Sequence, residues 1–549
     1  MTYRKLATRA VSIAFVCVWL IPAIGESLAA SNSQSSLETS APTTAIQTGV
    51  QMERSRKWID AIEHYQDALK AWPESKEIEY GLRRSKIHFS IERRHSDQSF
   101  ETSLLAKSRY DALGLFDDVL DQIRANYVDP ISSTSFVAHG TESFYLALSN
   151  DKFHNRHLTN AQPQRIAEMR KILREQYWNK PINYAGAARQ TVDEVANKAW
   201  SLLRIPYTAV VMEYVFGGCN ALDDYSNYLT PDRLDDLYGN IEGEFVGLGI
   251  EMKADGSQGL VLLNVLPNSP AAEGGMLRGD YIVGINGKSC REMTTDEAAR
   301  LLRGPAGSRV RLQVVQASTR QTRETDFVRR QVRVKSVSVA RIVDQESGIA
   351  YIQMNGFQKS TAAELDAALR DLDRQGMRAL IWDLRANPGG LLQSAVEVLD
   401  RFISGGTLVS TRGRTSGQNM SYSAYRPGTW QIPLVLLVDG DSASASEIVA
   451  GALRDHRRGK IVGRQTYGKW SVQSIFPLRD STGLRLTTAK FYSPNGHTLG
   501  KIGVRPDVVV DTSDQHSTFY RGPIHPSEVE TDADVRKGLD LLRSRLSRR

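Results

Sequence analysis

Three residues towards the C-terminal end of the chain have types and spacing suited to acyl-transfer chemistry. Ser444 lies in a string of small residues, Lys469 follows 25 residues later, and Gln473 comes four residues after the lysine. A serine hydroxyl attacks a carbonyl when a base removes its proton. A lysine can be that base once burial lowers its pKa from about 10.4 towards neutrality. Gln473 could orient the amine without holding it charged. The pattern predicts a serine nucleophile with a lysine base.

Two backbone N–H groups are candidates for an oxyanion hole beside this serine. If a helix begins near Ser444, the N–H of Ala445 has no acceptor within the helix and is available to a developing oxyanion. Gly390, which follows an earlier buried strand, fits as the second donor because a glycine lets a substrate backbone approach closely. Ser442 and Ser446 share the parity of Ser444, so an alternative is that all three serines serve capping and close packing.

Asp455 lies eleven residues after Ser444, which is about 16 Å along a continuous helix and too far for direct contact. We therefore predict a supporting role for Asp455. The expected ion-pair partners are Arg454, Arg457 or Arg464. His456 is equally distant from the serine, and the G-x-S-x-G pattern is absent around Ser444. No H-E-x-x-H motif and no phosphate-binding loop occur, so we predict no metal and no cofactor.

Alternating strands and helices after residue 330 would position these groups. Such a pattern predicts an α/β core with a partly parallel sheet, whose active groups lie at the carboxyl ends of the strands. We expect Lys469 on a further strand after the helix that follows Ser444. The predicted strands are 349–354, 379–384 and 434–438, and the predicted helices are 361–374, capped by Thr361, 391–402 and 448–458.

A β-rich segment precedes the core and resembles a PDZ domain. Its features are the Gly247-Leu248-Gly249-Ile250 segment, a strand over 260–265, a turn–strand–turn over 279–287, a helix over 294–302 and a last strand over 310–315. In a PDZ domain the first segment would hold a terminal carboxylate on its backbone N–H groups, while the peptide adds a strand beside it. A small β-domain without a ligand is the alternative.

The N-terminus has the pattern of a secretory signal peptide. Arg4, Lys5 and Arg9 precede an apolar stretch over 10–25, and small residues follow at 27–30. This predicts export to a periplasmic or cell-envelope space, with an uncleaved membrane anchor as the alternative. The formal charge of +7 includes no run of five like charges, which argues against nucleic-acid binding. Outside the signal segment only Cys219 and Cys290 remain, placed in different domains and unsuited to a disulfide framework.

An all-α domain is expected between the signal segment and the PDZ-like segment. One stretch has the second-helix spacing of a tetratricopeptide repeat: Ala61, Tyr65, Ala68, Leu69 and Pro73. An ordinary helical hairpin is the alternative. One such unit cannot bury its own face, so it needs a neighbouring helix or a partner, which suggests an adaptor or self-association. The predicted domains are signal peptide 1–30, flexible linker 31–45, helical domain 46–236, PDZ domain 237–332, protease core 333–512, and polar tail with C-terminal helix 513–549.

Together these residues resemble the carboxy-terminal processing protease family, also called tail-specific proteases. The resemblance covers residues 220–510 and includes Trp382 to Gly390, Ser442 to Gln473 and Gly503 to Asp507. It implies that Ser444 is the nucleophile and Lys469 the base, with Gln473 as the lysine's partner. It also implies the oxyanion donors Gly390 and Ala445, and in some members the aspartate at the position of Asp455 matters for activity.

The resemblance further implies that the PDZ domain binds the substrate's C-terminus and can gate the core. The expected partners are therefore proteins or peptides with free C-termini. Trp470 departs from the family, which usually has glycine after the lysine. Its ring could deepen the desolvation of the lysine or narrow the cleft. The resulting hypothesis is an exported serine endopeptidase that cleaves proteins at or from their C-termini. A catalytically silent peptide-binding scaffold is the alternative.

Overall fold

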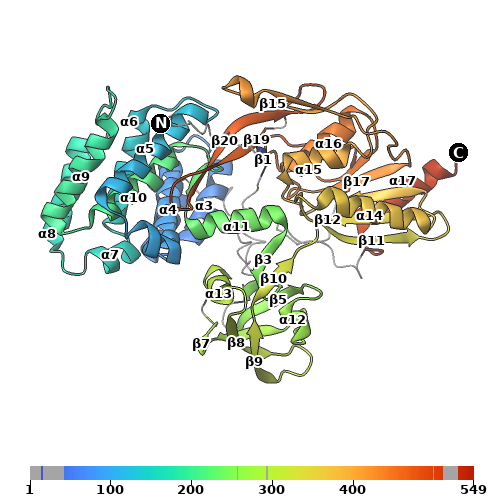
Figure 1. Ribbon diagram of the computed structural model, residues 1–549, viewed down its shortest axis with the longest axis horizontal. Coiled ribbons are helices and arrows are strands. Elements are labelled where there is room, and N and C mark those ends of the chain that lie inside the picture. The colour runs from blue at the N-terminus through green and yellow to red at the C-terminus, as the bar shows by residue number, and fades with distance from the viewer. Residues whose placement is uncertain are drawn as a thin grey trace, which may run out of the picture. The chain divides into compact units, whose positions relative to one another are not determined.

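The computed structural model describes residues 14–16, 42–255, 258–291, 293, 295–498, 500–510 and 529–548 (Figure 1). Two compact units divide the chain. The first contains the described residues from Pro42 to Asp235 together with Gln473–Thr488, and the second contains Asp236–Val472 and the described residues from Ala489 onward. The predicted signal peptide lies outside the described residues except for β1 (Ala14–Val16), which pairs antiparallel with β14 (Gly390–Leu391).

Helices build the first unit. They are α2 (Pro42–Arg54), α3 (Trp58–Ala71), α4 (Lys76–Arg94), α5 (Arg109–Asn126), α6 (Ser133–Ala147), α7 (Asp151–His157), α8 (Pro163–Ile172), α9 (Ala187–Leu203) and α10 (Tyr207–Gly218). The helix α2 begins inside the stretch that was expected to be a flexible linker over 31–45. In α3, Ala61, Tyr65 and Ala68 are buried as their spacing predicts. Their partners are α2 and α4, so the hairpin buries its apolar face within the chain.

Small residues allow the close contact between α6 and α10. A Cβ atom on Gly140 would lie 2.9 Å from Cα of Tyr214, and one on Gly217 would lie 3.0 Å from Cα of Gly140. The short strand β2 (Asn227–Leu229) pairs antiparallel with the first residues of β20 (Gly483–Tyr492). This pairing joins a segment from the C-terminal part of the chain to the helical unit.

The second unit contains the predicted PDZ-like segment. Its elements are β3 (Glu244–Gly247), β4 (Ile250–Asp255), β5 (Gly259–Val265), α12 (Pro270–Glu273), β6 (Tyr281–Ile285), β7 (Lys288–Ser289), α13 (Thr295–Leu302), β8 (Arg309–Val315), β9 (Thr322–Val328) and β10 (Arg330–Arg333). The strand order is β4-β5-β6-β8-β9, and β10 pairs with β3. The prediction that 310–315 is the last strand is wrong. The strand β9 was missed because most of its side chains are polar and only Phe327 is buried.

A six-stranded sheet forms the core that follows. Its order is β11 (Val337–Asp344), β12 (Ile349–Met354), β13 (Ala379–Asp383), β17 (Leu434–Val438), β18 (Lys460–Gly463) and β21 (Val508–Val509). The strand β11 is antiparallel to β12 and the remaining pairs are parallel, which confirms the partly parallel α/β core. A second sheet contains β15 (Thr407–Gly413), β16 (Met420–Ser423), β19 (Ser471–Pro477) and β20.

Both faces of the six-stranded sheet are covered. The helices α14 (Thr361–Arg374), α15 (Leu392–Leu399) and α16 (Ala445–Asp455) pack on the face that carries Ile352, Trp382 and Leu436. The C-terminal helix α17 (Ala533–Leu546) packs on the opposite face, against Tyr351, Ile381 and Leu437. This two-sided burial explains why these strands are continuous apolar runs.

Several details differ from the sequence-based expectations, including the ends of α15 at Leu399 rather than 402 and of α16 at Asp455 rather than 458. Lys469 does not lie on a strand: β18 ends at Gly463 and β19 begins at Ser471, so the lysine belongs to the connecting loop. The helix α16 begins at Ala445, three residues earlier than predicted. Thr361 is the first residue of α14 rather than its cap, which is Ser360. Among the described residues, no helix combines the length and the apolar character needed to cross a bilayer. Cys219 and Cys290 are buried free thiols in different units.

Candidate active site

Ser444 occupies a strained turn between β17 and α16. Its φ is +63° and its ψ is −112°, values that a residue with a side chain rarely adopts. The residue is fully buried, and its Oγ makes no hydrogen bond to the described part of the chain. Strain of this kind persists only where the surroundings impose it, and it is concentrated at functional sites. The turn therefore presents a hydroxyl that donates no hydrogen bond to any described residue.

The other two serines of the string have structural partners. The Oγ of Ser442 donates to the carbonyl of Leu384 at 2.7 Å, and the Oγ of Ser446 donates to the carbonyl of Asn387 at 2.9 Å. Both acceptors lie after β13, so these serines tie the turn to the glycine-containing loop that follows that strand. Their hydroxyls serve structure, which sets Ser444 apart from its neighbours.

Asp439 links the same two loops at the end of β17. Its Oδ1 accepts hydrogen bonds from the N–H groups of Ala386 and Ser442, each at 3.0 Å. The first donor belongs to the loop after β13 and the second to the serine turn. The carboxyl ends of two neighbouring parallel strands are thus connected side chain to backbone, as expected for an active site at this edge of the sheet.

Gly389 and Gly390 lie against the serine turn. Gly389 has a φ of +101°, and a Cβ atom on it would lie 2.8 Å from Cβ of Ser444 and 2.9 Å from the nitrogen of Ala445. Gly389 therefore places the loop that contains the predicted donor Gly390 directly against the other predicted donor, Ala445. Ala445 is the first residue of α16, so its N–H has no acceptor within the helix. The sequence reasoning chose Gly390 and missed Gly389, although the Gly-Gly pair was a visible signal.

Glu447 connects the serine turn to the lysine loop. This fully buried carboxylate accepts four hydrogen bonds: from the N–H of Ser444 at 2.8 Å, Thr466 Oγ1 at 2.6 Å, the N–H of Gly468 at 2.6 Å and the N–H of Lys469 at 2.8 Å. Burial raises the pKa of Glu447, and the four hydrogen bonds oppose this rise. The sequence-based predictions above give Glu447 no role in the site. The spacing Ser444-x-x-Glu447 was the available signal, because it is a capping-box pattern.

Lys469 is almost fully buried, with 1% of its surface exposed. A second segment holds its loop from the other side: the N–H of Lys501 donates to the carbonyl of Gly468 at 2.9 Å, and the N–H of Val504 donates to Thr466 Oγ1 at 2.7 Å. The lysine loop is thus fixed between Glu447 and residues 501–504.

Trp470, the departure from the family pattern, packs against that second segment. Its Nε1 would lie 3.0 Å from a Cβ atom placed on Gly500, and the Nζ of Lys490 lies 4.6 Å from its ring centroid. The tryptophan therefore has packing partners of its own beside the lysine loop.

Asp455 ends α16 with a side chain that is only 4% exposed. It forms the predicted ion pair with Arg454 at 3.1 Å. Its Oδ2 also accepts a hydrogen bond from the N–H of Asn495 at 3.0 Å, at the start of the segment that continues to Lys501. His456 contacts the carbonyl of Thr407 at 2.7 Å. Gln473 is buried on β19, where its Nε2 donates to Thr487 Oγ1 at 3.1 Å.

The predicted peptide-binding loop connects β3 to β4. Its carbonyls are engaged, since Leu248 O accepts from Ala271 N at 3.0 Å and Gly249 O accepts from Leu266 N at 2.8 Å. Ile250 begins β4, which is the edge strand of its sheet. Among the described residues, no group of three or more His, Cys, Asp or Glu residues is arranged to hold a metal ion.

Comparisons with known proteins agree with this architecture. The family profile "Peptidase family S41" matches residues 348–510, and a PDZ-domain profile matches residues 261–316. A carboxy-terminal-processing protease of Bartonella bacilliformis is 39% identical over 296 residues, covering 53% of this chain and 67% of the relative. A carboxyl-terminal-processing protease of Synechocystis is 34% identical over 323 residues, covering 58% and 74%.

A solved structure titled "Photosystem II D1 C-terminal processing protease" is 26% identical, with a TM-score of 0.39, and covers 73% of this chain and 93% of that chain. The two sequence relatives each match more than half of this chain, and the chain spans two thirds or more of each. The helical region, the PDZ domain and the core with its mixed sheet were all predicted. The chain is a serine-type peptidase that belongs to the carboxy-terminal-processing protease family.

Proposed function

We propose that the chain is an exported endopeptidase that cleaves proteins at or from their C-termini, with Ser444 as nucleophile and Lys469 as general base. One observation carries this proposal: the N–H groups of Ser444 and Lys469 donate to the same Oε2 atom of Glu447, each at 2.8 Å. A single buried carboxylate therefore holds both backbones close together. Two further observations support the proposal: Ser444 Oγ has no hydrogen-bond partner in the described part of the chain, and Lys469 is buried.

The reaction follows from these roles. The neutral amine of Lys469 removes the proton from Ser444 Oγ as this oxygen attacks the scissile carbonyl, and the ammonium then protonates the leaving amine. Water next attacks the acyl-enzyme, with the same lysine as base. Gln473 is proposed to orient the lysine amine.

The N–H groups of Gly390 and Ala445 are proposed to bind the oxyanion of each tetrahedral intermediate. Loss of one such donor costs about 3 kcal/mol of barrier. The N-terminus of α16 adds the positive end of its helix dipole to this position.

Substrate selection is proposed to lie in the PDZ domain. The Gly247-Leu248-Gly249-Ile250 loop would receive the terminal carboxylate, and the substrate would pair with the free edge of β4. Ile250 and Met252 are only partly buried and pack beside the domain core, which leaves an apolar surface for a C-terminal side chain. The C-terminal end of β4 is less available to a substrate strand, because the N–H of Ala254 already donates to Thr295 Oγ1 at 3.1 Å.

Apart from the start of the helical domain, the domain limits are proposed as predicted, with a cleaved signal peptide over 1–30 and the mature chain in the periplasm or cell envelope. The helical domain would begin at Pro42, the first residue of α2. This domain is proposed to associate with a partner protein.

Cleavage of an unstructured protein with an apolar C-terminus tests the mechanism. The mature chain is compared with Ser444→Ala and Lys469→Ala, and with Lys460→Ala, which removes a lysine exposed on β18. We expect kcat/KM to fall at least about a thousandfold in the first two variants, and to be unchanged in the third. Full activity in Lys469→Ala would disprove the lysine base. Labelling of the parent chain but not of Ser444→Ala by a serine-reactive phosphonate would exclude a silent scaffold.

A further inference from the structure

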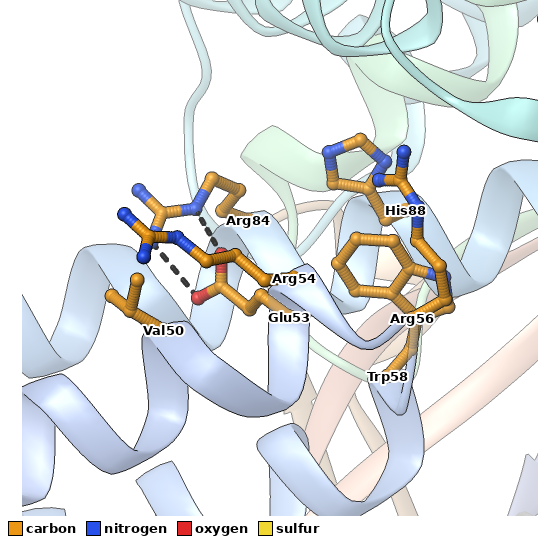
Figure 2. Close-up of a pocket in the computed structure, with 7 residues that line it drawn as sticks. All are labelled: Val50, Glu53, Arg54, Arg56, Trp58, Arg84 and His88. Carbon is orange, nitrogen blue, oxygen red and sulfur yellow. Dashed lines mark hydrogen bonds and ion pairs between the residues drawn. The ribbon is translucent and has the colours of Figure 1, made fainter.

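The hairpin α2–α3 and helix α4 line a pocket of about 410 Å³ that shares no residue with the proposed proteolytic machinery (Figure 2). Its walls are formed by Val50, Glu53, Arg54, Arg56, Trp58, Arg84 and His88. In Figure 2 the side chains of Arg54 and Arg84 lie on one side, and those of Arg56, Trp58 and His88 lie on the other. The pocket thus combines guanidinium groups with a pair of almost completely buried aromatic rings.

The first side of the pocket has an excess of positive charge. The carboxylate of Glu53 is already engaged: it accepts hydrogen bonds from Arg84 at 2.7 and 2.9 Å and from the hydroxyl of Tyr65 at 2.8 Å. Arg54, at the end of α2, is exposed and forms no ion pair with the described residues. As far as the described residues go, its five donors therefore remain available to an external anion.

The second side is a rigid stack. The rings of Trp58 and His88 are parallel, with centroids 4.3 Å apart and planes 7° apart, and the guanidinium of Arg56 lies 5.7 Å from the Trp58 ring. The indole N–H donates to Glu92 at 2.6 Å, and Arg56 pairs with Asp151 at 2.8 Å. Burial and then the charges of Arg56, Arg84 and Arg170 lower the pKa of His88 to about 4. The histidine is neutral at pH 7, and its neighbours place it in a positive field.

We propose that this pocket binds carboxylate side chains of an acidic segment in a partner protein. The guanidinium of Arg54 can hold a carboxylate with two parallel hydrogen bonds. Trp58 and His88 are only 4% and 5% exposed, so their stack supports the wall of the pocket while the exposed Arg54 meets the ligand. The volume accommodates one or two side chains, so the expected ligand is an exposed acidic stretch rather than a folded surface. This pocket would be the site of the partner association proposed for the helical domain, and its binding of carboxylates does not depend on proteolysis.

A binding measurement on the inactive full chain, Ser444→Ala, tests the site independently of cleavage. The probe is a fluorescein-labelled peptide of six glutamates, followed by fluorescence anisotropy at low salt, with a six-glutamine peptide as the neutral reference. Adding Arg54→Glu reverses one exposed charge without removing an internal contact. We expect its Kd to be at least about tenfold higher, because a hydrogen bond to a charged group contributes about 1.5–3 kcal/mol.

Lys70→Glu is the matched control, because it makes the same charge change on exposed α3 surface. It lies twelve residues beyond Trp58, about 18 Å along the helix. We expect its Kd to stay within about twofold of the parent. Equal weakening by both substitutions would reduce the effect to net charge and overturn the proposal. The proposal would also be overturned if the glutamate peptide did not bind, or if a fluorescein-labelled six-nucleotide oligothymidine bound more tightly than the glutamate peptide. Arg54→Ala is the second variant, and we expect it to raise the Kd for the glutamate peptide less than Arg54→Glu does.

Discussion

Glu447 accepts a hydrogen bond from the N–H of Lys469 at 2.8 Å across a separation of 22 residues. The same carboxylate accepts from the N–H of Ser444, so one side chain at the start of α16 fixes two loops. The lysine loop has no strand of its own at this point, because β19 begins only at Ser471. Its position therefore depends on side-chain contacts rather than on a ladder of backbone hydrogen bonds.

The first prediction concerns Glu447→Gln. The amide is similar in shape, but it replaces one acceptor oxygen with an NH2 group that faces N–H donors, so at least one hydrogen bond is lost and a repulsive contact is created. We expect kcat to fall at least about tenfold with little change in KM, because the loss of a buried charged acceptor costs about 1.5–3 kcal/mol. Steady-state cleavage of a peptide substrate measures both constants.

Glu397→Gln is the matched control, because it makes the same chemical change at a half-exposed position of α15. Parent-like kinetics are expected for that variant. Parent-like kinetics for Glu447→Gln, in a protein that unfolds at the parent's temperature, would show that Glu447 does not position the two loops.

The second prediction concerns Gly389→Ala. A methyl group there would lie 2.7 Å from the carbonyl of Ala443 and 2.8 Å from Cβ of Ser444, and the φ of +101° is unfavourable for alanine. We expect cleavage to be abolished, because the loop that carries the proposed donor Gly390 must move away from Ser444. Gly405→Ala is the control, since nothing lies within 4 Å of its added Cβ. Equal activity in both variants would contradict the close approach of the two loops.

The third prediction concerns Asp455, which lies at the end of α16 far from Ser444. Its Oδ2 holds the N–H of Asn495, and the segment that begins there continues to Lys501, whose N–H donates to Gly468 O beside the lysine. We therefore propose that Asp455 is a positioning residue. We expect Asp455→Ala to lower kcat about tenfold with KM nearly unchanged, given about 1.5–3 kcal/mol for a hydrogen bond to a charged group.

Two further variants separate this role from others. Asp455→Asn keeps an oxygen that can accept from Asn495 and should recover most of the kcat. Arg454→Ala removes only the ion pair and should retain activity. If Asp455→Asn is as slow as Asp455→Ala, the negative charge rather than the hydrogen bond to Asn495 is required, and the positioning role is wrong.

Much of the fold could be predicted because its signals are local. The apolar runs at 349–354 and 434–438 and the amphipathic period over 361–374 coincide with β12, β17 and α14. The strands β9 and β11 were missed because neither is a continuous apolar run: residues 322–326 of β9 are all polar, and Ser338, Arg341 and Asp344 interrupt β11. The contacts around Lys469 could not be predicted from local sequence patterns either. Glu447 and residues 501–504 reach it only through the folded chain, and neither carries a periodic pattern.

In the candidate site, too, some features could be predicted from the sequence and others could not. The types and spacing of Ser444 and Lys469 were visible as a motif, but three serines of equal parity could not be ranked by sequence. The structure ranks them by hydrogen bonding, because the Oγ atoms of Ser442 and Ser446 have carbonyl acceptors and that of Ser444 has none among the described residues. Hydrogen bonds between loops depend on tertiary placement, which a single sequence does not encode locally.

The last prediction concerns acid sensitivity of the helical domain. His95 follows α4 and is buried against the rings of Phe100, Phe153 and His157, with centroids 5.1, 5.6 and 5.5 Å away. Neither of its ring nitrogens has a hydrogen-bond partner among the described residues. Burial, followed by the charges of Arg94, His157 and Arg156, lowers the pKa of His95 to about 2.

The sign of the effect follows from this lowered pKa. Below the unfolded pKa of about 6.5, His95 is protonated in the unfolded chain but stays neutral in the folded chain. The free energy of unfolding therefore falls as the pH falls, by up to about 1.4 kcal/mol per pH unit. His95→Phe removes the group and keeps an aromatic ring among aromatic neighbours. We therefore expect the urea midpoint of the helical signal to drop less between pH 7 and pH 5 in His95→Phe than in the parent. His497→Phe, in an exposed loop, is the control for removing a histidine. An equal drop in parent and His95→Phe would assign the acid sensitivity to other groups.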